Sequence, residues 1–425
     1  MPRTSSYPPP PRSPFPPLEL SEYEEVRYQE LLDEIVNEAI DEYHDYTQTC
    51  GGRVDARRWK LLKRREALTM YKERSDYVHE YPRLLDQETI TSPASSTDTF
   101  SVRDSGGSAR LGSSILTASS TPLILSVGSI VGTLEDAMLG VFADSTAALR
   151  LKYSYGKDHV EDCAMLSRIA GPTEQDPFRF VGIQWFMNEL QGLNALARKR
   201  DFLMLTSTGI TTTKAGKRIG YYVNHSMTHR AVPPDAKRAV VRGKISCCCL
   251  YQQVDSNRVQ VFMQAYIEPN GHMIDHFAVK GYAASLFAIG SVSHCAQMKK
   301  LHWLLRHRDA LRRNTNVTDP SQCSTCCKPL TRKLFGSSPC RCTMCGLQAC
   351  GRCTIAKKLT VDTSISKVVQ KPLPICVSCM LAVAQFPAHK VARAQADESE
   401  RTHKARANSE QLTPKSMTSE DYAVC

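Results

Sequence analysis

Apolar residues recur at every second position in several stretches between residues 122 and 312, a period typical of strands. The stretch FRFVGIQWFM places four apolar side chains on one face, those of Val181, Ile183, Trp185 and Met187. The stretch RVQVFMQAYIE does the same with Val259, Val261, Met263, Ala265 and Ile267. Further strands are predicted over DFLMLTSTG, RIGYYVNHSM and GKISCCCLY. The connection QQVDSN predicts a hairpin between GKISCCCLY and RVQVFMQAYIE.

Segments with helical signals lie before and after these predicted strands. The stretch GTLEDAMLGVF predicts a helix capped by Thr133, with Glu135 and Asp136 in its first turn. After the last strand, steps of three and four predict one long helix from about Phe277 to Arg313, whose apolar side holds Val279, Tyr282, Leu286, Ile289, Val292 and Cys295. Such a helix can cover one face of an antiparallel sheet. The predicted fold over residues 122–313 is therefore α+β, a helix-grip with a curved antiparallel sheet and a long C-terminal helix, around either a packed core or a cavity.

Residues 18–88 are predicted to form a helical hairpin that belongs either to the same domain or beside it. Ser21 and Glu24 have the spacing of a capping box, and apolar side chains follow at helical spacing, namely Tyr28, Leu32, Ile35, Ala39 and Tyr43. Residues 19–45 contain eleven acidic residues, whereas Arg53–Arg74 contains nine basic and three acidic ones. Two helices of opposite charge are the simplest interpretation. A basic helix that faces a membrane is the alternative.

Three segments have the composition of disordered chain. Residues 1–17 are rich in proline, and residues 89–121 contain sixteen Ser and Thr, which fits a linker or insert. Residues 395–425 are polar and of mixed charge, which predicts a disordered tail. A cysteine-rich segment, residues 315–382, precedes that tail.

The segment from about 125 to 312 resembles a START-type lipid-binding domain. The resemblance rests on DPFRFVGIQWF, on RDFLMLTSTG at 200–209, on GKRIGYYVNHSM, and on the long helix after the last strand. It implies a helix-grip fold around a hydrophobic tunnel that holds one lipid. These motifs mark no residue of the tunnel, so the resemblance assigns no lipid contact there.

Composition narrows the class of partner. The net charge of +11 and the pI near 8.9 favour anionic partners such as acidic lipid or nucleic acid. No apolar run is long enough to predict a membrane span, and MPRTSSYPPPPRSPFPP lacks the apolar region of a secretory signal. These features predict a cytoplasmic protein. In that reducing compartment, seventeen cysteines favour metal binding over disulfides.

Eight of the cysteines form four C-x-x-C pairs between residues 323 and 379. Two tetrahedral zinc sites of four thiolates need eight ligands, and a C-x-x-C turn lets two thiolates reach one ion. Only four residues separate Cys345 from Cys350, so these adjacent pairs are poorly placed to share an ion. The spacing therefore predicts two interleaved Zn²⁺ sites, one held by Cys323, Cys326, Cys350 and Cys353 and the other by Cys342, Cys345, Cys376 and Cys379.

Both ions are predicted to be structural, because sites made only of thiolates leave no position for an activated water. Cys327 and Cys340 are surplus to these sites. Residues 247–249 form a run of three cysteines on a predicted strand. Neighbours on a strand point to opposite faces and no companion ligand lies nearby, so the run is interpreted as buried packing.

The stretch CTMCGLQACGRCTIAKKL resembles a FYVE-type zinc finger, whose pattern C-x2-C-G-x3-C-x2-C includes a glycine at the place of Gly346. The resemblance covers about 315–382 and implies a two-zinc cross-brace finger that docks on phosphoinositide membranes such as those of endosomes. The family's basic signature is reduced here to Arg341, and the tryptophan of its upstream motif is absent. Arg332, Lys333 and Arg341 are the candidate residues for a lipid head group.

Two functions stay open from the sequence. The first is a non-enzymatic lipid-binding or lipid-transfer protein whose finger docks on anionic membrane such as that of endosomes. The second is an adaptor whose finger binds protein and whose grip domain has a filled core. Nucleic-acid binding is disfavoured, because no regular basic helix follows the zinc ligands and few aromatic residues are available to stack on bases. No catalytic motif of Ser/His/Asp, phosphate-loop or HExxH type occurs, which argues against an enzyme.

Overall fold

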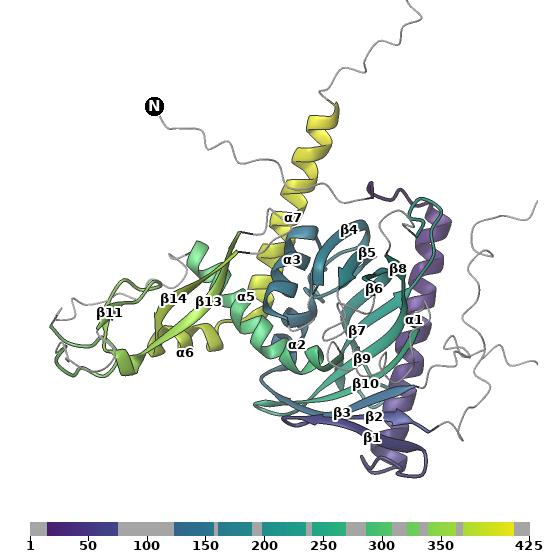
Figure 1. The fold of residues 1–425 in the computed structure, drawn as a ribbon, viewed down its shortest axis with the longest axis horizontal. Coiled ribbons are helices and arrows are strands. Elements are labelled where there is room, and N and C mark those ends of the chain that lie inside the picture. The colour runs from purple at the N-terminus through teal and green to yellow at the C-terminus, as the bar shows by residue number, and fades with distance from the viewer. Residues whose placement is uncertain are drawn as a thin grey trace, which may run out of the picture.

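The computed structural model describes residues 15–74, 123–156, 160–188, 198–234, 240–268, 286–307, 321–330, 339–362 and 369–411. Within them, one large sheet lies at the centre, with helices on both of its faces and a cysteine-rich unit to one side (Figure 1). Four of the predictions concern residues outside the described part of the chain. They are the proline-rich residues 1–14, the Ser/Thr-rich segment 89–121, the end of the tail at 412–425, and the basic pair Arg332 and Lys333.

The large sheet runs in the order β1-β2-β3-β10-β9-β7-β6-β5-β4, and all of these neighbours pair antiparallel. The short strand β8 pairs in parallel with β6. The strands are β1 Trp59–Arg65, β2 Leu68–Glu73, β3 Ile124–Val131, β4 Val160–Ala170, β5 Phe180–Asn188, β6 Arg200–Thr212, β7 Arg218–Ser226, β8 Val241–Arg242, β9 Lys244–Asp255 and β10 Arg258–Glu268.

Successive residues of a strand point to opposite faces of the sheet, and each face of this sheet carries an apolar cluster. On β5, Val181, Ile183 and Trp185 belong to an apolar cluster on one face, with Met187 packed against it. On β10, the five alternating residues belong to a second cluster on the opposite face: Val259, Val261, Met263, Ala265 and Ile267. The faces predicted for these two strands are therefore confirmed.

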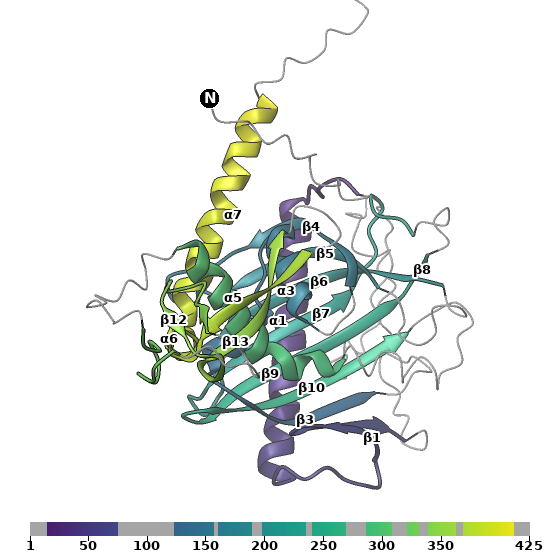
Figure 2. The same cartoon turned by 60° about the vertical axis from the view of Figure 1, so that its left-hand side comes forward.

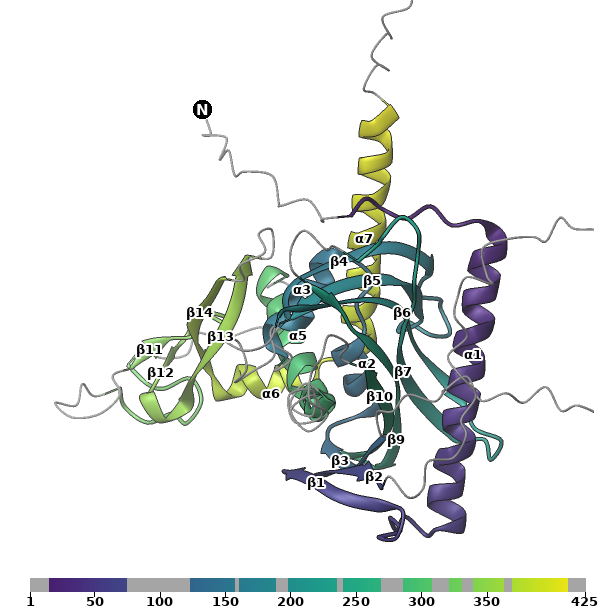
Figure 3. The same ribbon diagram turned by 45° about the vertical axis from the view of Figure 1, so that its right-hand side comes forward.

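Helix α1 (Glu22–His44) covers the first of these faces (Figure 3). The predicted capping box is present, since Ser21 Oγ accepts from the Glu24 N–H while the Glu24 carboxylate accepts from the Ser21 N–H. The predicted apolar stripe is buried against the sheet: Tyr28, Leu32, Ile35, Ala39 and Tyr43. Just before α1, the ring of Phe15 lies 5.6 Å from that of Trp185. Disorder is thus the wrong prediction for the last residues of segment 1–17.

Helices α2 (Leu134–Val141), α3 (Thr146–Tyr155) and α5 (Val292–Arg306), with a 3-10 turn at Phe287–Ser291, cover the opposite face, here called the inner face. Thr133 caps α2 as predicted, because its Oγ1 accepts from the Asp136 N–H at 3.1 Å. The buried Lys299 of α5 donates to carbonyls at the end of α2, 2.9 Å from Leu139 O and 2.6 Å from Phe142 O. The α+β helix-grip architecture is therefore confirmed.

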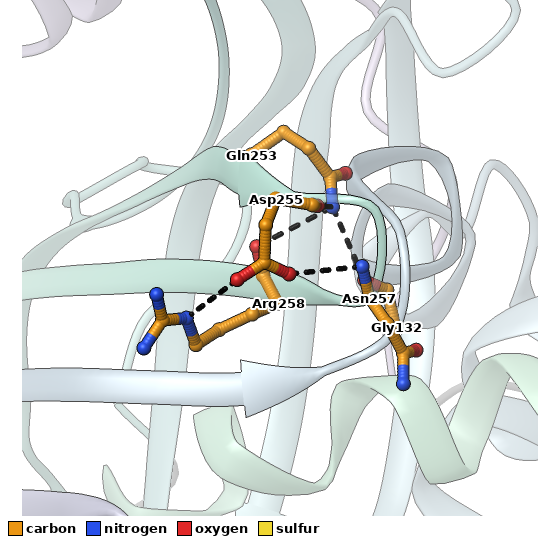
Figure 4. A network of polar contacts seen from close by, with 5 residues as sticks. All are labelled: Gly132, Gln253, Asp255, Asn257 and Arg258. Atoms are coloured by element: carbon orange, nitrogen blue, oxygen red, sulfur yellow. Dashed lines mark hydrogen bonds and ion pairs between the residues drawn. The ribbon is translucent and has the colours of Figure 1, made fainter.

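The predicted hairpin between β9 and β10 is also present, with its turn at residues 256–257. Figure 4 shows how polar contacts fix this turn. The Asp255 carboxylate accepts from the Asn257 N–H at 3.1 Å and from Arg258 Nε at 3.0 Å. The Gln253 side chain donates to the carbonyls of Asp255 and Gly132, at 2.5 and 3.3 Å. Since Gly132 precedes α2, the turn also positions that helix.

The basic segment Arg53–Arg74 is a β-hairpin, so the second helix of the predicted helical hairpin is wrong. Strands β1 and β2 pair through a turn in which Glu66 has a φ of 53°. Leu68 and Met70 of β2 face the inner cluster, while Tyr71 packs against the α1-side cluster. This alternation between the two faces is typical of a strand. The other edge of β2 forms hydrogen bonds with β3, which is remote in sequence. The charges and the spacing of apolar residues within Arg53–Arg74 do not indicate that β3 pairs with this segment.

Two predictions at the C-terminal end also need correction. Of the helix predicted over Phe277–Arg313, the described residues 286–307 form a 3-10 turn at Phe287–Ser291 and then α5, so the predicted helix is not α-helical throughout, and both of its predicted ends lie outside the described residues. Residues 395–411 are helical, because they continue α7 (Ala388–Gln411). Small residues at spacings of three and four, Ala388, Val391, Ala392 and Ala396, bury one side of α7. Ser399 Oγ then donates to Asp144 at 3.0 Å, so tertiary contacts order a polar sequence.

Candidate metal centres and cavity

The cysteine-rich unit comprises two short ladders and one helix. The ladders are β11 (Cys340–Arg341) with β12 (Gln348–Ala349), and β13 (Thr354–Asp362) with β14 (Val369–Cys376). Helix α6 (Val377–Gln385) follows β14 directly. The second ladder places Thr354 opposite Cys376, which brings two cysteine pairs that are distant in sequence to one end of the ladder.

Eight thiols gather into two groups, in each of which all four sulfur atoms lie within 4.8 Å of one another. The groups are Cys323, Cys326, Cys350 and Cys353, and Cys342, Cys345, Cys376 and Cys379. This is the interleaved grouping that the spacing predicts. Cys327 and Cys340 belong to neither group among the described residues.

The sulfur geometry fits a tetrahedral ion. With metal–sulfur bonds of about 2.3 Å, a regular tetrahedron has edges of about 3.8 Å. The Cys326 and Cys350 sulfurs are 3.9 Å apart, and so are the Cys345 and Cys376 sulfurs. Four sulfur donors and no oxygen donor suit zinc better than magnesium or calcium.

The backbone around both groups is arranged to hold thiolates. The first C-x-x-C turn of each group is followed by a left-handed residue, Cys327 at φ 56° and Gly346 at φ 75°. The N–H groups of these residues donate to the carbonyls of Cys323 and Cys342, at 2.8 and 2.9 Å. Gly346 thus serves the turn that its place in the pattern predicts, and Cys327 occupies the equivalent position in the other group.

Backbone N–H groups also point at the sulfurs. Cys350 N–H donates to Cys323 Sγ, and Cys376 N–H to Cys342 Sγ, both at 3.3 Å. Burial raises the pKa of the Cys323 thiol, but N–H donors from Cys350, Cys326 and Thr325 outweigh it and lower that pKa to about 6. These N–H donors therefore favour the thiolate form of Cys323, which is the form that binds metal.

The cysteine-rich unit shares a hydrophobic core with the helices of the inner face (Figure 2). Cys323 and Cys342 belong to the same apolar cluster as Met298, Leu301 and Leu304 of α5. Polar contacts reinforce this join. The Thr360 N–H donates to the Tyr155 hydroxyl at 3.0 Å, and Gln370 Nε2 donates to the Ser154 carbonyl at 2.8 Å.

Of the predicted head-group residues, only Arg341 belongs to the described part of the chain. Arg341 is exposed on β11, whereas Arg332 and Lys333 lie outside the described residues. The other exposed basic residues in the described part of the unit are Lys328, Arg352, Lys358 and Lys371. The run Cys247–Cys249 is buried as predicted, with Cys247 and Cys249 on the inner face and Cys248 on the α1 side.

A cavity of about 120 Å³ lies between the inner face of the sheet and helices α2, α3 and α5. Most of its described lining is apolar, including Val141, Phe186, Met204, Ile245, Met263 and Val292. Its polar lining includes Lys152, Asn188, Tyr222, Asn224 and Tyr251. The question of core or cavity, which the sequence left open, is therefore answered in favour of a cavity.

No local sequence pattern indicates which polar residues line this cavity. Lys152 stands in an ordinary helical stretch, where a lysine is usually solvated. Tyr222 and Tyr251 occupy strands in which aromatic residues commonly pack in the core. Strand register together with the placement of α3 would have been needed to find them.

Comparisons with known proteins identify similar folds at low identity. No family model matches the chain, and no curated protein is similar to it in sequence. Human StAR-related lipid transfer protein 5 has 12% identity and a TM-score of 0.40, over 64% of this chain and 99% of that one. Human STARD10 has 12% identity and a TM-score of 0.37, over 63% of this chain and 84% of that one.

A third similar structure is a fragment of the STAR-related lipid transfer protein from Xanthomonas axonopodis. It has 12% identity and a TM-score of 0.33, over 56% of this chain and 99% of that one. Among the described helices of the present chain, none is long and apolar enough to cross a membrane.

Proposed function

We propose that this chain is a non-enzymatic lipid-binding or lipid-transfer protein of the START type. The cavity carries this proposal. It lies between the inner face of the sheet and α2, α3 and α5, and its described lining is mainly apolar. A concave, mostly apolar site with a few convergent polar groups is typical of sites for small amphipathic ligands.

In this proposal each group of four cysteines binds one structural Zn²⁺. The ions order the cysteine-rich unit as a FYVE-like finger, and metal binding supplies much of its folding free energy. The sulfur separations of 3.9 Å and the N–H donors to Cys323 and Cys342 support zinc.

The cysteine-rich unit then docks the protein on anionic membrane, such as phosphoinositide-bearing endosomal membrane, from the cytoplasm. Five exposed basic residues of the described unit support this role, namely Lys328, Arg341, Arg352, Lys358 and Lys371. A basic residue near an anionic bilayer contributes about 1 kcal/mol, so several together give reversible attachment. Arg332 and Lys333 are proposed to add to the same attraction.

The proposal is tested with the zinc-loaded full chain in two assays. Organic extraction of the purified protein should release a lipid, and flotation with phosphatidylserine vesicles should show binding that weakens with salt. Arg341→Ser should weaken flotation, whereas Lys217→Ser, at an exposed residue remote from the unit, should not. A lipid-free protein that also ignores anionic vesicles would exclude the proposed function.

An adaptor role is the second candidate. Ile355, Val361 and Val369 of the β13–β14 ladder are 40%, 47% and 39% exposed, and apolar residues at a surface favour protein contacts. If the adaptor hypothesis is correct, Ile355→Ser should abolish capture of a protein partner, whereas flotation with vesicles should stay unchanged. Loss of flotation without loss of partner would favour the membrane role.

A further inference from the structure

Lys152 of α3 brings a positive charge into the apolar cavity. The residue is 8% exposed, and its Nζ donates to the Tyr222 hydroxyl at 2.8 Å. The same Nζ lies 4.3 Å from the centroid of the Tyr222 ring and 5.2 Å from that of the Tyr153 ring. All three residues line the cavity. Two aromatic faces and one hydroxyl therefore hold the ammonium over the inner face of the sheet.

The Lys152 ammonium indicates the kind of ligand that the cavity binds, because most of the described lining around it is apolar. An ammonium in apolar surroundings is costly, and hydrogen bonds together with opposite charge offset that cost. A ligand with an acidic group would accept a hydrogen bond from the Lys152 ammonium and add opposite charge, whereas an amine would add repulsion. The positive charge of Lys152 therefore favours a ligand whose head group is acidic.

Tyr251 adds an independent observation. Its side chain is fully buried and lines the cavity, and its hydroxyl has no hydrogen-bond partner among the described residues. The Cys249 thiol interacts with it, but a thiol is a weak acceptor. Burial raises the pKa of Tyr251 well above its usual value, so the hydroxyl keeps its proton and can donate. Native proteins seldom leave such a buried donor without an acceptor.

The strand register places this hydroxyl beside the lysine. Tyr222 of β7 lies opposite Cys249 of β9. Tyr251 comes two residues later on β9, so it shares the face of Tyr222 and is its diagonal neighbour, at about 7–8 Å between backbones. The Lys152 ammonium, which is bonded to Tyr222, and the Tyr251 hydroxyl therefore belong to one patch of the cavity wall.

We infer that Lys152, Tyr222 and Tyr251 form a subsite for the acidic head group, a carboxylate or a phosphate, of a single-chain lipid. This inference rests on the proposed lipid binding and specifies its ligand. The acid accepts from the ammonium and from the Tyr251 hydroxyl, and the chain follows the apolar lining. The cavity of about 120 Å³ is smaller than an engineered cavity of about 150 Å³ that admits benzene, so it can enclose the head group and the adjoining carbons of one chain but not two chains.

A competition experiment with the full chain tests this subsite. The neutral fluorescent probe N-phenyl-1-naphthylamine is first bound to the full chain and is then displaced with oleate, with oleoyl lysophosphatidate or with oleyl alcohol, which share one chain length. At least one acid should displace the probe about tenfold more strongly than the alcohol does. The better of the two acids distinguishes a carboxylate from a phosphate as the preferred head group.

Variants assign the preference to the residues. Lys152→Met keeps the apolar stem and should reduce the advantage of the acid to about twofold or less, whereas Lys152→Arg should keep most of it. Tyr251→Phe keeps the ring and should lower the advantage by about threefold. Lys217→Met makes the same charge change at an exposed residue and should leave the preference unchanged.

Two outcomes would overturn the inference in different ways. Equal displacement by the acids and the alcohol, or an unchanged preference in Lys152→Met, would exclude the subsite and leave lipid binding in place. Failure of the probe and of all three ligands to bind would exclude the proposed function as well.

Discussion

The hydroxyl of Tyr155, at the end of α3, accepts a 3.0 Å hydrogen bond from the backbone N–H of Thr360 on β13. Beside it, the hydroxyl oxygens of Ser154 and Thr360 are 2.7 Å apart. Both contacts join the grip to the cysteine-rich unit, and α3 also lines the cavity. The two candidate sites therefore share a supporting helix and form one folded body.

Tyr155→Phe should destabilise the protein by about 1–3 kcal/mol, because it leaves a buried N–H without an acceptor. Thr360 is 2% exposed, so water cannot readily replace the lost hydroxyl. The free energy of unfolding is measured by urea titration. Tyr23→Phe is the matched control, since Tyr23 is 62% exposed and its change should stay within about 0.5 kcal/mol. Equal effects of the two variants would contradict this role of Tyr155.

Removal of zinc by a chelator should loosen the grip as well as the cysteine-rich unit. Met298, Leu301 and Leu304 of α5 pack in the same cluster as Cys323 and Cys342. Hydrogen exchange followed by mass spectrometry should therefore speed up in α3 and α5. Helix α1, on the opposite face of the sheet, serves as the internal control and should keep its protection. Faster exchange confined to residues 321–385 would show that the two parts are independent.

Cys323→Ser should lower the zinc content from two ions to one per chain. The residue is buried, belongs to the first group, and its sulfur accepts the Cys350 N–H. Cys327→Ser is the control, because the Cys327 thiol is exposed and lies outside both groups. Elemental analysis of the purified variants gives the count. Loss of an ion from Cys327→Ser, or two ions in Cys323→Ser, would contradict the grouping.

Acid should weaken the fold through His225. Burial lowers the pKa of His225 from 6.5 to about 4 in the folded chain, where the ring contacts Ser246 Oγ at 2.9 Å. The unfolded chain thus binds more protons between these values, so stability is full above pH 6.5 and falls as the pH drops towards 4. Between pH 7 and pH 5 the loss from this residue is about 2 kcal/mol.

The measurement is urea unfolding at both pH values. His225→Gln keeps a side chain that can bond Ser246 and cannot titrate, so it should lose about 2 kcal/mol less than the wild type. The cysteine groups contribute equally to both proteins and cancel in the comparison. Identical losses in the two proteins would show that His225 is not the titrating group.

Much of the fold can be predicted from the spacing of apolar residues along the chain. The alternating residues of β5 and β10 and the stripe on α1 are predictable, since each element buries a face that its own sequence displays. The cysteine grouping is predictable because short loops limit which pairs can share an ion. Capping residues Ser21 and Thr133 likewise signal their helices locally.

The errors arise where remote segments decide the structure. The hairpin of β1 and β2 is completed by β3, and α7 is ordered by Asp144 and the inner-face cluster. Nothing local in Arg53–Arg74 or in the polar tail indicates these contacts. Lys152 was missed for the same reason, because its place in the cavity depends on Tyr222, seventy positions later in the chain.

Native mass spectrometry of the full chain tests the central claim most directly, because it weighs the metal and the ligand together. The account predicts a folded species that carries two zinc ions and one single-chain acidic lipid. Mild acid that protonates the thiolates should release the zinc, and organic solvent should release the lipid. A folded chain without zinc, or one that carries zinc but takes up no lipid when supplied with oleate or oleoyl lysophosphatidate, would contradict the account.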